Sequence, residues 1–307
     1  MSKKARKLSL LLAAIFVMMI MAVPAFATVY HTDSDTAAYY TQDDNDSSYY
    51  TSTAITVTLD IQSKRNGTAS TDTSYSKELD ITLTPSSSTR YTVADLLIAA
   101  NNMTGESIHF QNYDGNDLDY GSSGSLPSYC YKAVLDGVTY APTGLYDKNG
   151  WMFRINGKFP LHSGIPGSTA YGEAINTAYV KDGDVVTFYM DNPGDLFKLA
   201  YFSRIKEATY SSGVLTVTPQ VSYNFYYGNA NTWYIQNFYT SSDITCEVYS
   251  SITATTPLAS AVTGSNGKAN LSVTLTSGNT YYIRVMKEFY DSSAFINTTR
   301  CLVAFTA

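Results

Sequence analysis

The stretch GWMFRINGK at positions 150–158 and the stretch YVKDGDVVTFYM at positions 179–190 are the most informative parts of this 307-residue sequence. In the first stretch, Trp151, Phe153 and Ile155 alternate with less apolar neighbours, which is the two-residue period of a β-strand with one buried face. The second stretch begins with a Lys-Asp-Gly-Asp turn and continues as an apolar strand. We therefore predict two strands of one sheet, separated by a loop of about twenty residues.

These stretches resemble the domain at the C-terminal end of transcobalamin and intrinsic factor, which also occurs in many bacterial surface proteins. The matching positions are Gly150, Trp151, Gly157, Gly164, Ile165, Tyr179, Lys181, Asp182, Gly183 and Asp184. The resemblance covers residues 55–193 and implies a β-grasp-like sheet crossed by one helix. It also implies cobalamin or another corrinoid as a candidate ligand. The vitamin-binding relatives hold cobalamin between this domain and a helical barrel, for which this sequence has no counterpart.

The residues before these stretches predict the other parts of such a domain. Apolar residues alternate with polar ones over 55–61 and again over 79–83, which predicts two half-buried strands. Thr92 to Asp95 has the form of a capping box, and apolar residues at helical spacing follow until Asn101. Asn156-Gly157 supplies the positive φ angles of a tight turn. The order strand, strand, helix, strand agrees with the expected β-grasp.

The C-terminal third has a different pattern. From Val214 onward, short strands recur between turn signals such as Gly264 to Lys268, which is typical of a β-sandwich of about seven strands. We expect a linker at 210–213. The predicted fold class is mainly β: a β-grasp-like α+β domain with one helix, then an all-β immunoglobulin-like sandwich. The predicted boundaries are 1–27 for a signal peptide, 28–52 for an acidic mobile lead-in, 53–208 for the first domain and 209–307 for the second.

The N-terminus predicts export. A basic segment at 2–7, an apolar run at 8–23 and the sequence Ala25-Phe26-Ala27 form a secretory signal peptide cleaved after Ala27, with an uncleaved membrane anchor as the alternative. No later segment is apolar enough to span a membrane. We therefore expect a secreted, extracellular protein that is either soluble or held to a cell surface by noncovalent contacts.

Composition excludes several classes of function. The formal net charge is −6, and this acidic balance argues against nucleic acid, because affinity for nucleic acid is built on clustered Lys and Arg. The three histidines are isolated and no Cys-x-x-Cys is present, so we expect no metal site. Cys246 and Cys301 could form a disulfide, with Cys130 as a free thiol. Alternatively, the chain contains no disulfide. No nucleophile, phosphate-binding or metalloprotease motif occurs, so we predict no catalytic residues and no enzyme.

The candidate ligand-binding residues are Trp151, Tyr146, His162 and Tyr171, which lie in or beside the long loop at 159–179. Aromatic side chains there could form a platform for a small flat ligand, although Trp151 could equally belong to the core. We expect a non-enzymatic surface binding or adhesion protein, with a cell-surface protein, a glycan or a flat molecule as partner. Corrinoid capture with a partner chain is the alternative, and a secreted glycan-acting hydrolase is a lower one. No cofactor is expected.

Overall fold

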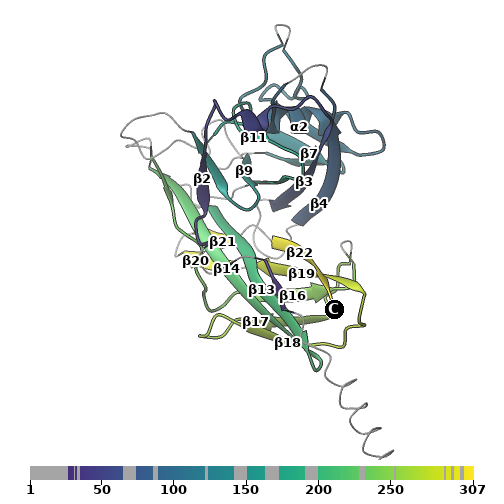
Figure 1. The fold of residues 1–307 in the computed structure, drawn as a ribbon, viewed down its shortest axis with the longest axis vertical. Coiled ribbons are helices and arrows are strands. Elements are labelled where there is room, and N and C mark those ends of the chain that lie inside the picture. The colour runs from purple at the N-terminus through teal and green to yellow at the C-terminus, as the bar shows by residue number, and fades with distance from the viewer. Residues whose placement is uncertain are drawn as a thin grey trace, which may run out of the picture.

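The computed structural model describes residues 27–30, 32, 35–64, 74–85, 89–121, 124–141, 151–162, 173–190, 200–227, 232–251, 254–286, 288–291, 294–297 and 301–307. The described chain is mainly β with a single α-helix, as predicted. Figure 1 shows a helix-containing domain above a sandwich of strands, with the long strands β13 and β14 running diagonally along the sandwich and reaching up toward β2. The predicted signal peptide lies outside the described residues, except for Ala27.

The first domain is built on a four-stranded mixed sheet. Its strands are β3 (Ile55–Lys64), β4 (Ser74–Leu83), β9 (Trp151–Ile155) and β12 (Val185–Met190), in the order β4-β3-β12-β9. The central pair, β3 and β12, is parallel, and both outer pairs are antiparallel. A parallel central pair flanked by two antiparallel strands is the β-grasp arrangement. The strands predicted in the stretches 150–158 and 179–190 therefore belong to one sheet, as the sequence predicted, and pair directly.

Helix α2 (Val93–Asn101) crosses one face of this sheet. The Thr92 side chain accepts a hydrogen bond from the Asp95 N–H, and the Asp95 carboxylate accepts one from the Thr92 N–H, which completes the predicted capping box. Leu96 and Leu97 are fully buried in one core with the apolar residues of β3 and β12. The helix thus covers the apolar face of the sheet and leaves the opposite face for other contacts.

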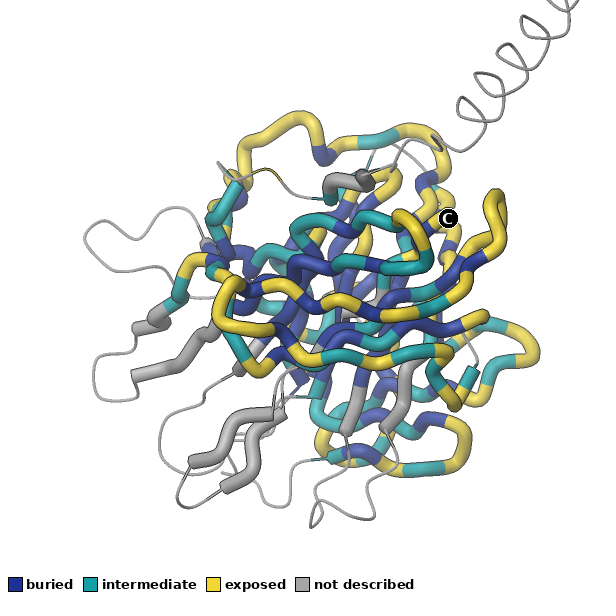
Figure 2. The backbone as a smooth tube through the Cα atoms, turned by 90° about the horizontal axis from the view of Figure 1, so that it is seen from below, coloured by how far each residue is buried: buried dark blue, intermediate teal, exposed yellow. Residues whose placement is uncertain are grey.

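Short strands complete this domain. They are β5 (Tyr91–Thr92) with β11 (Tyr179–Val180), and β6 (Ile108–Gln111) with β7 (Lys132–Leu135) and β8 (Val138–Tyr140). The turn after β9 has positive φ at Asn156 and Gly157, as predicted. Figure 2 shows exposed residues alternating with buried ones along outer strands and also covering turns and loops.

The second domain is a two-sheet sandwich. One sheet contains β1 (Ala27–Val29), β13 (Ala200–Ser211), β14 (Val214–Tyr227), β15 (Thr232–Ile235) and β18 (Ala269–Ser272). The other contains β17 (Ala259–Val262), β16 (Thr245–Tyr249), β19 (Thr280–Met286) and β22 (Cys301–Thr306). A separate hairpin joins β20 (Glu288–Asp291) to β21 (Ala294–Asn297). Residues from both sheets, among them Val217 and Ile283, share one core.

The predicted linker at 210–213 is wrong. Strands β13 and β14 pair from Ser211 and Val214 outward, so Ser212 and Gly213 form the two-residue turn of a long hairpin. Both have positive φ, 51° and 80°, which a right-twisted hairpin turn requires. The Ser-Ser-Gly sequence, which indicated a flexible linker, therefore supplies the residues of a tight turn.

The expected mobile lead-in is also ordered where it is described. Strand β1 pairs with β13 of the sandwich, and β2 (Tyr39–Gln42) pairs in parallel with β10 (Phe159–His162) of the first domain. A 3-10 turn, η1 (Ser47–Tyr49), follows. Ala38 is buried in one cluster with Tyr189 of the first domain and Phe202 of the second, so this segment contributes to packing between the domains, which its acidic composition did not indicate.

A buried arginine lies where the domains meet. Arg154 of β9 is on the sheet face opposite the helix and is fully buried. Its guanidinium lies 4.5 Å from the centre of the Phe202 ring of β13 and donates a hydrogen bond to the Ala38 carbonyl at 3.2 Å. Burial lowers the pKa of Arg154. Arg204 of β13 stacks on Phe238 at 3.9 Å, so two cations and two aromatic rings form the contact.

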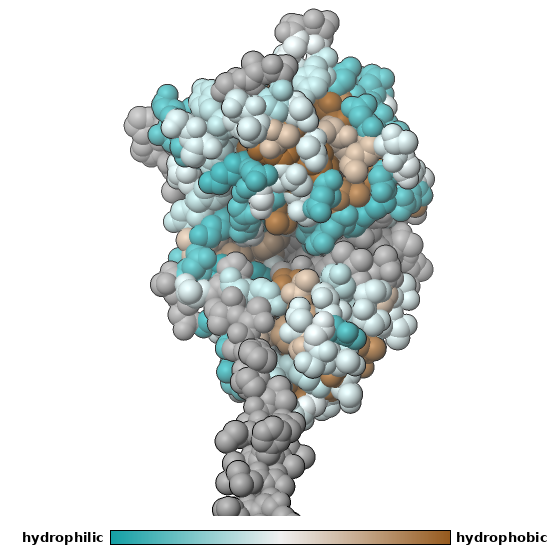
Figure 3. All heavy atoms as spheres, turned by 45° about the vertical axis from the view of Figure 1, so that its right-hand side comes forward, coloured by the Kyte–Doolittle hydropathy of each residue, from teal (hydrophilic) through white to brown (hydrophobic). Residues whose placement is uncertain are grey.

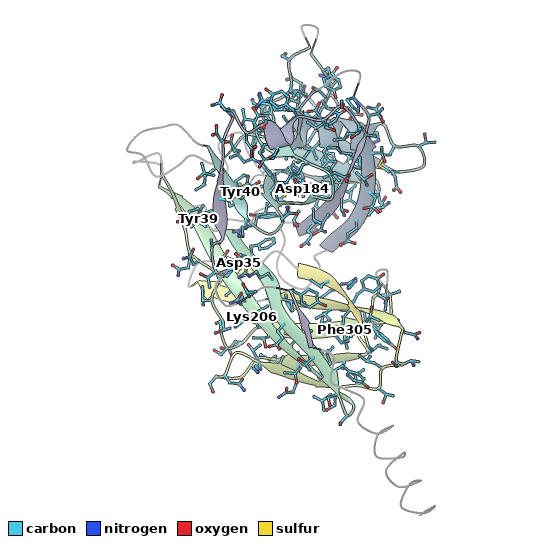
Figure 4. The ribbon with its side chains drawn as sticks, in the orientation of Figure 1. Asp35, Tyr39, Tyr40, Asp184, Lys206 and Phe305 are labelled. Carbon is cyan, nitrogen blue, oxygen red and sulfur yellow. The ribbon has the colours of Figure 1, made fainter. Side chains whose placement is uncertain are left out.

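Asp35 joins the two domains through its charge. Its Oδ1 lies 2.8 Å from Lys158 Nζ of the first domain, and its backbone carbonyl accepts a hydrogen bond from Arg204 of the second. Figure 4 shows Asp35 at the level where the domains meet. Backbone bonds from Phe159 to Ala38 and from Phe238 to Thr36 continue the contact. The N-terminal segment 35–42 therefore ties the domains together.

The register of the second sheet separates two of the cysteines. Cys246 of β16 and Cys301 of β22 both pair with Val285 of the intervening strand β19. Two strand spacings amount to about 9 to 10 Å, which exceeds the Cα separation that a disulfide can bridge. The Cys246–Cys301 pairing that the sequence left open is therefore wrong. Within the described residues, no helix has the length and apolarity to cross a bilayer.

Candidate functional site

A small apolar pocket opens beside Trp151 in the first domain. Its volume is about 150 Å³. The residues that line it are Ser128, Tyr129, Cys130, Trp151, Met152, Phe153, Phe159, Glu173, Ala174, Ile175 and Phe188. They come from β9, β10, β12 and the segments before β7 and β11, so the sheet forms the floor and connecting segments form the rim.

Trp151 is held rigidly in this floor. It begins β9, where the register places it opposite Met190 of β12, and its ring stacks on Phe188 with a centroid distance of 4.9 Å. Phe110 meets both rings edge-on. The indole nitrogen donates to the Tyr140 carbonyl at 3.4 Å. Only 5% of Trp151 is exposed, so it is a core residue that also forms one wall of the pocket.

One acidic residue, Glu173, is among the mostly apolar residues of the lining. Glu173 is buried and accepts a hydrogen bond from Thr177 Oγ1 at 2.5 Å, while its backbone N–H donates to the Pro160 carbonyl. Such fixed polar groups in an apolar pocket orient a ligand. Glu173 can accept a further hydrogen bond or balance a cation that enters.

The rim carries an exposed tyrosine and an inert thiol. Half of Tyr129 is exposed, whereas the neighbouring Cys130 points inward and is buried. Burial raises the pKa of the Cys130 thiol far above its ordinary value. Because the thiolate is the nucleophilic form, we expect the buried Cys130 thiol to react slowly.

The structure brings one of the four predicted ligand residues to this pocket. Trp151 lines it, and Phe153, which the sequence favoured as core, is buried beside it. His162 ends β10, where its backbone pairs with Gln42. Tyr146 and Tyr171 lie outside the described residues.

Sequence reasoning missed Glu173, Tyr129 and Cys130 as lining residues. Each lies in a connecting segment without periodicity, so no pattern assigned it to a face. One signal was present: the predicted loop at 159–179 contains a single acidic residue, Glu173, among small and apolar ones. A lone carboxylate in such a segment is a candidate for a buried polar contact.

The described residues contain no group of three His, Cys, Asp or Glu side chains that could hold a metal ion. A buried carboxyl occurs elsewhere in the first domain. Asp60 of β3 lies opposite Glu78 of β4, and burial raises the pKa of Asp60 to about 7, with Glu78 adding to the effect. It is on the sheet face away from the Trp151 ring, so it takes no part in the pocket.

Figure 3 shows apolar residues exposed in small patches between polar ones on the helix-containing domain.

Comparison of the chain with models of known protein families, with curated proteins and with solved structures gave no match.

Proposed function

We propose that this protein is a secreted, non-enzymatic binding or adhesion protein that captures one apolar group of a partner in the Trp151 pocket. The observation that carries the proposal is a preformed apolar pocket with a rigid aromatic floor and one carboxylate. Such pockets receive the anchor side chains that dominate binding at interfaces.

The volume of the Trp151 pocket limits the size of the group that can enter it. A cavity of about 150 Å³ holds a molecule of benzene size. A phenyl ring or a branched aliphatic side chain fits, whereas a corrin macrocycle does not. Cobalamin would therefore need a surface beyond this pocket, supplied by a partner chain, and corrinoid capture stays the less supported proposal.

The energetics favour a multivalent role. Burial of one apolar side chain contributes about 1.5 to 3 kcal/mol, which alone gives only weak binding. A secreted protein that uses one such anchor gains useful affinity from repeated or additional contacts, as adhesion proteins do.

The test uses two probes that differ in charge, phenethylamine and 2-phenylethanol. Fluorescence of Trp151 in a Trp233→Phe background reports their binding. We expect both to bind, with phenethylamine several-fold tighter because Glu173 balances its ammonium. Glu173→Gln should remove this preference and keep the binding of the alcohol.

Ala174→Leu places extra atoms in the pocket without removing a core side chain. We expect it to abolish the binding of both probes, and Ala254→Leu in the sandwich to leave binding unchanged. Failure of either probe to bind, or binding that survives Ala174→Leu, would refute the proposal. Trp151→Ala is less informative, because loss of a stacked core ring costs about 3 to 5 kcal/mol of stability by itself.

A further inference from the structure

A second, polar groove lies in the first domain, between the segment after η1 and the turn that precedes β12. Its volume is about 300 Å³, at the lower end of the range for small-molecule sites. The two walls are residues 48–55 and residues 180–182. None of them lines the Trp151 pocket.

Main-chain hydrogen bonds fix both walls. Thr51 and Thr89 exchange both backbone hydrogen bonds at 2.9 Å. Across the groove, the Thr56 N–H donates to Asp182 Oδ1 at 2.8 Å, and the Gly183 N–H donates to the Thr56 carbonyl at 2.9 Å. A groove with fixed walls loses little conformational entropy when a ligand binds.

Tyrosines and cations stack at this groove. The Arg90 guanidinium lies 4.2 Å from the Tyr179 ring centre and 4.9 Å from the Tyr50 ring centre. Lys181 Nζ lies 5.5 Å from the ring of Tyr49. Half of the Tyr50 residue is exposed, although Arg90 restrains its ring. An exposed ring held in place by such a contact is a ready platform for stacking.

Apart from Ala54, Ile55 and Val180, the remaining lining residues are polar, and their charges almost cancel. Ser48, Thr51 and Thr53 supply hydroxyl groups, which both donate and accept hydrogen bonds. The charges of Lys181 and Asp182, adjacent on the second wall, offset each other. The groove therefore suits a ligand with many hydrogen-bonding groups, at least one apolar face and no net charge.

We propose that this groove binds a neutral saccharide. A sugar ring presents hydroxyl groups at its edge and C–H groups on its faces. The face stacks on Tyr50, and the hydroxyls pair with the Ser and Thr hydroxyls, with Lys181 and with the free side of Asp182. An anionic ligand fits less well, because Asp182 lies beside the only cation in the lining of this described groove.

The experiment measures retention of the protein on three immobilised oligosaccharides: cellotetraose, N-acetylchitotetraose and trigalacturonic acid. We expect retention on at least one neutral oligosaccharide and none on the acidic one. Tyr50→Ala should weaken retention at least about tenfold. Lys181→Met, an exposed change that keeps the aliphatic stem, should weaken it several-fold and provides a second variant if Tyr50→Ala unfolds.

The matched control is Tyr113→Ala. Tyr113 is also exposed, at 58%, in the same domain, and its ring packs on Tyr131 outside the groove. This substitution should leave retention unchanged. Ala174→Leu, which fills the Trp151 pocket, should also leave retention unchanged, so the groove is tested independently of the proposed function of that pocket. Retention on neither neutral oligosaccharide, retention on the acidic one, or an equal loss in Tyr113→Ala would overturn the proposal.

Discussion

The buried carboxyl of Asp60 should make the stability of the first domain depend on pH. Asp60 is 6% exposed, and its Oδ2 accepts a hydrogen bond from Gln62 Nε2 at 2.7 Å. Within the described part of the chain, its Oδ1 has no hydrogen-bond partner. Burial is the main reason that its pKa is raised from 3.8 to about 7, and the negative charge of Glu78 adds to it.

The sign follows from the two pKa values. The folded protein keeps the Asp60 proton up to about pH 7, whereas the unfolded chain loses it near pH 3.8. The raised pKa therefore stabilises the fold fully below pH 3.8, and this contribution is lost as pH rises through 7. A difference of roughly three units corresponds to about 4 kcal/mol in total, of which about 3 kcal/mol falls between pH 5 and pH 8. Glu78, whose pKa is also raised, acts in the same direction.

Urea unfolding at pH 5, 6, 7 and 8, followed by Trp151 fluorescence in the Trp233→Phe background, measures this effect. We expect the free energy of unfolding to fall by about 3 kcal/mol across the series. Asp60→Asn is neutral and nearly isosteric with the protonated acid, so it should remove most of the slope and be more stable than the parent at pH 8. Asp46 and Asp117 do not interfere, because their pKa values are lowered and they titrate below this window.

Two results would refute the reasoning. One is a parent protein whose unfolding free energy is the same at pH 5 and pH 8. The other is an Asp60→Asn variant that keeps the full slope, which would assign the proton to another group.

Three further predictions concern the domain contact, the hairpin and the thiol. Arg154→Ala should lower stability by about 3 kcal/mol, because it leaves a cavity beneath Phe202; calorimetry should show the domains unfolding separately, and a single unchanged transition would contradict the assigned contact. Gly213→Ala should cost about 1 kcal/mol, because its φ is 80° while an added Cβ meets only ordinary contacts; unchanged urea unfolding would speak against the turn. Cys130 should resist a thiol reagent such as dithionitrobenzoate in the folded protein and react in urea, and fast native labelling would disprove its burial.

Much of the first domain follows from local patterns. The alternation in β3 and β4, the capping box at Thr92 and the turn at Asn156-Gly157 each depend on residues close in sequence, and the structure contains all of them. The strand topology was predicted from the resemblance to a β-grasp domain, and the parallel pairing of β3 with β12 agrees with that prediction. The family relationship itself stays a prediction.

Other elements depended on distant partners. Strand β17 and the hairpin of β20 and β21 carry weak local patterns and were not predicted. The segment at 210–213 has the composition of a linker, and only the pairing of β13 with β14 makes it a turn. The acidic lead-in has little to bury on its own, yet it packs because two domains provide surfaces for it.

The candidate site was likewise predicted only in part from local patterns. The sequence singled out Trp151, because a bulky aromatic residue on an alternating strand faces either a core or a ligand. It could not decide between the two, since that depends on whether Phe188 and Phe110 cover the ring. Sequence reasoning did not find the polar groove, because its walls are more than 120 residues apart and are brought together by tertiary contacts such as the hydrogen bond from the Thr56 N–H to Asp182.

The sequence alone determined the mainly β class, the single helix and the faces that β3, β4 and β9 bury, because periodicity and caps act over a few residues. Only the tertiary structure decided that Arg154 would be buried between aromatic rings, that segment 35–42 would join the domains, and that two pockets would form. The physical reason is that burial depends on what packs against a side chain. That neighbour is often more than a hundred residues away, so no local pattern contains it.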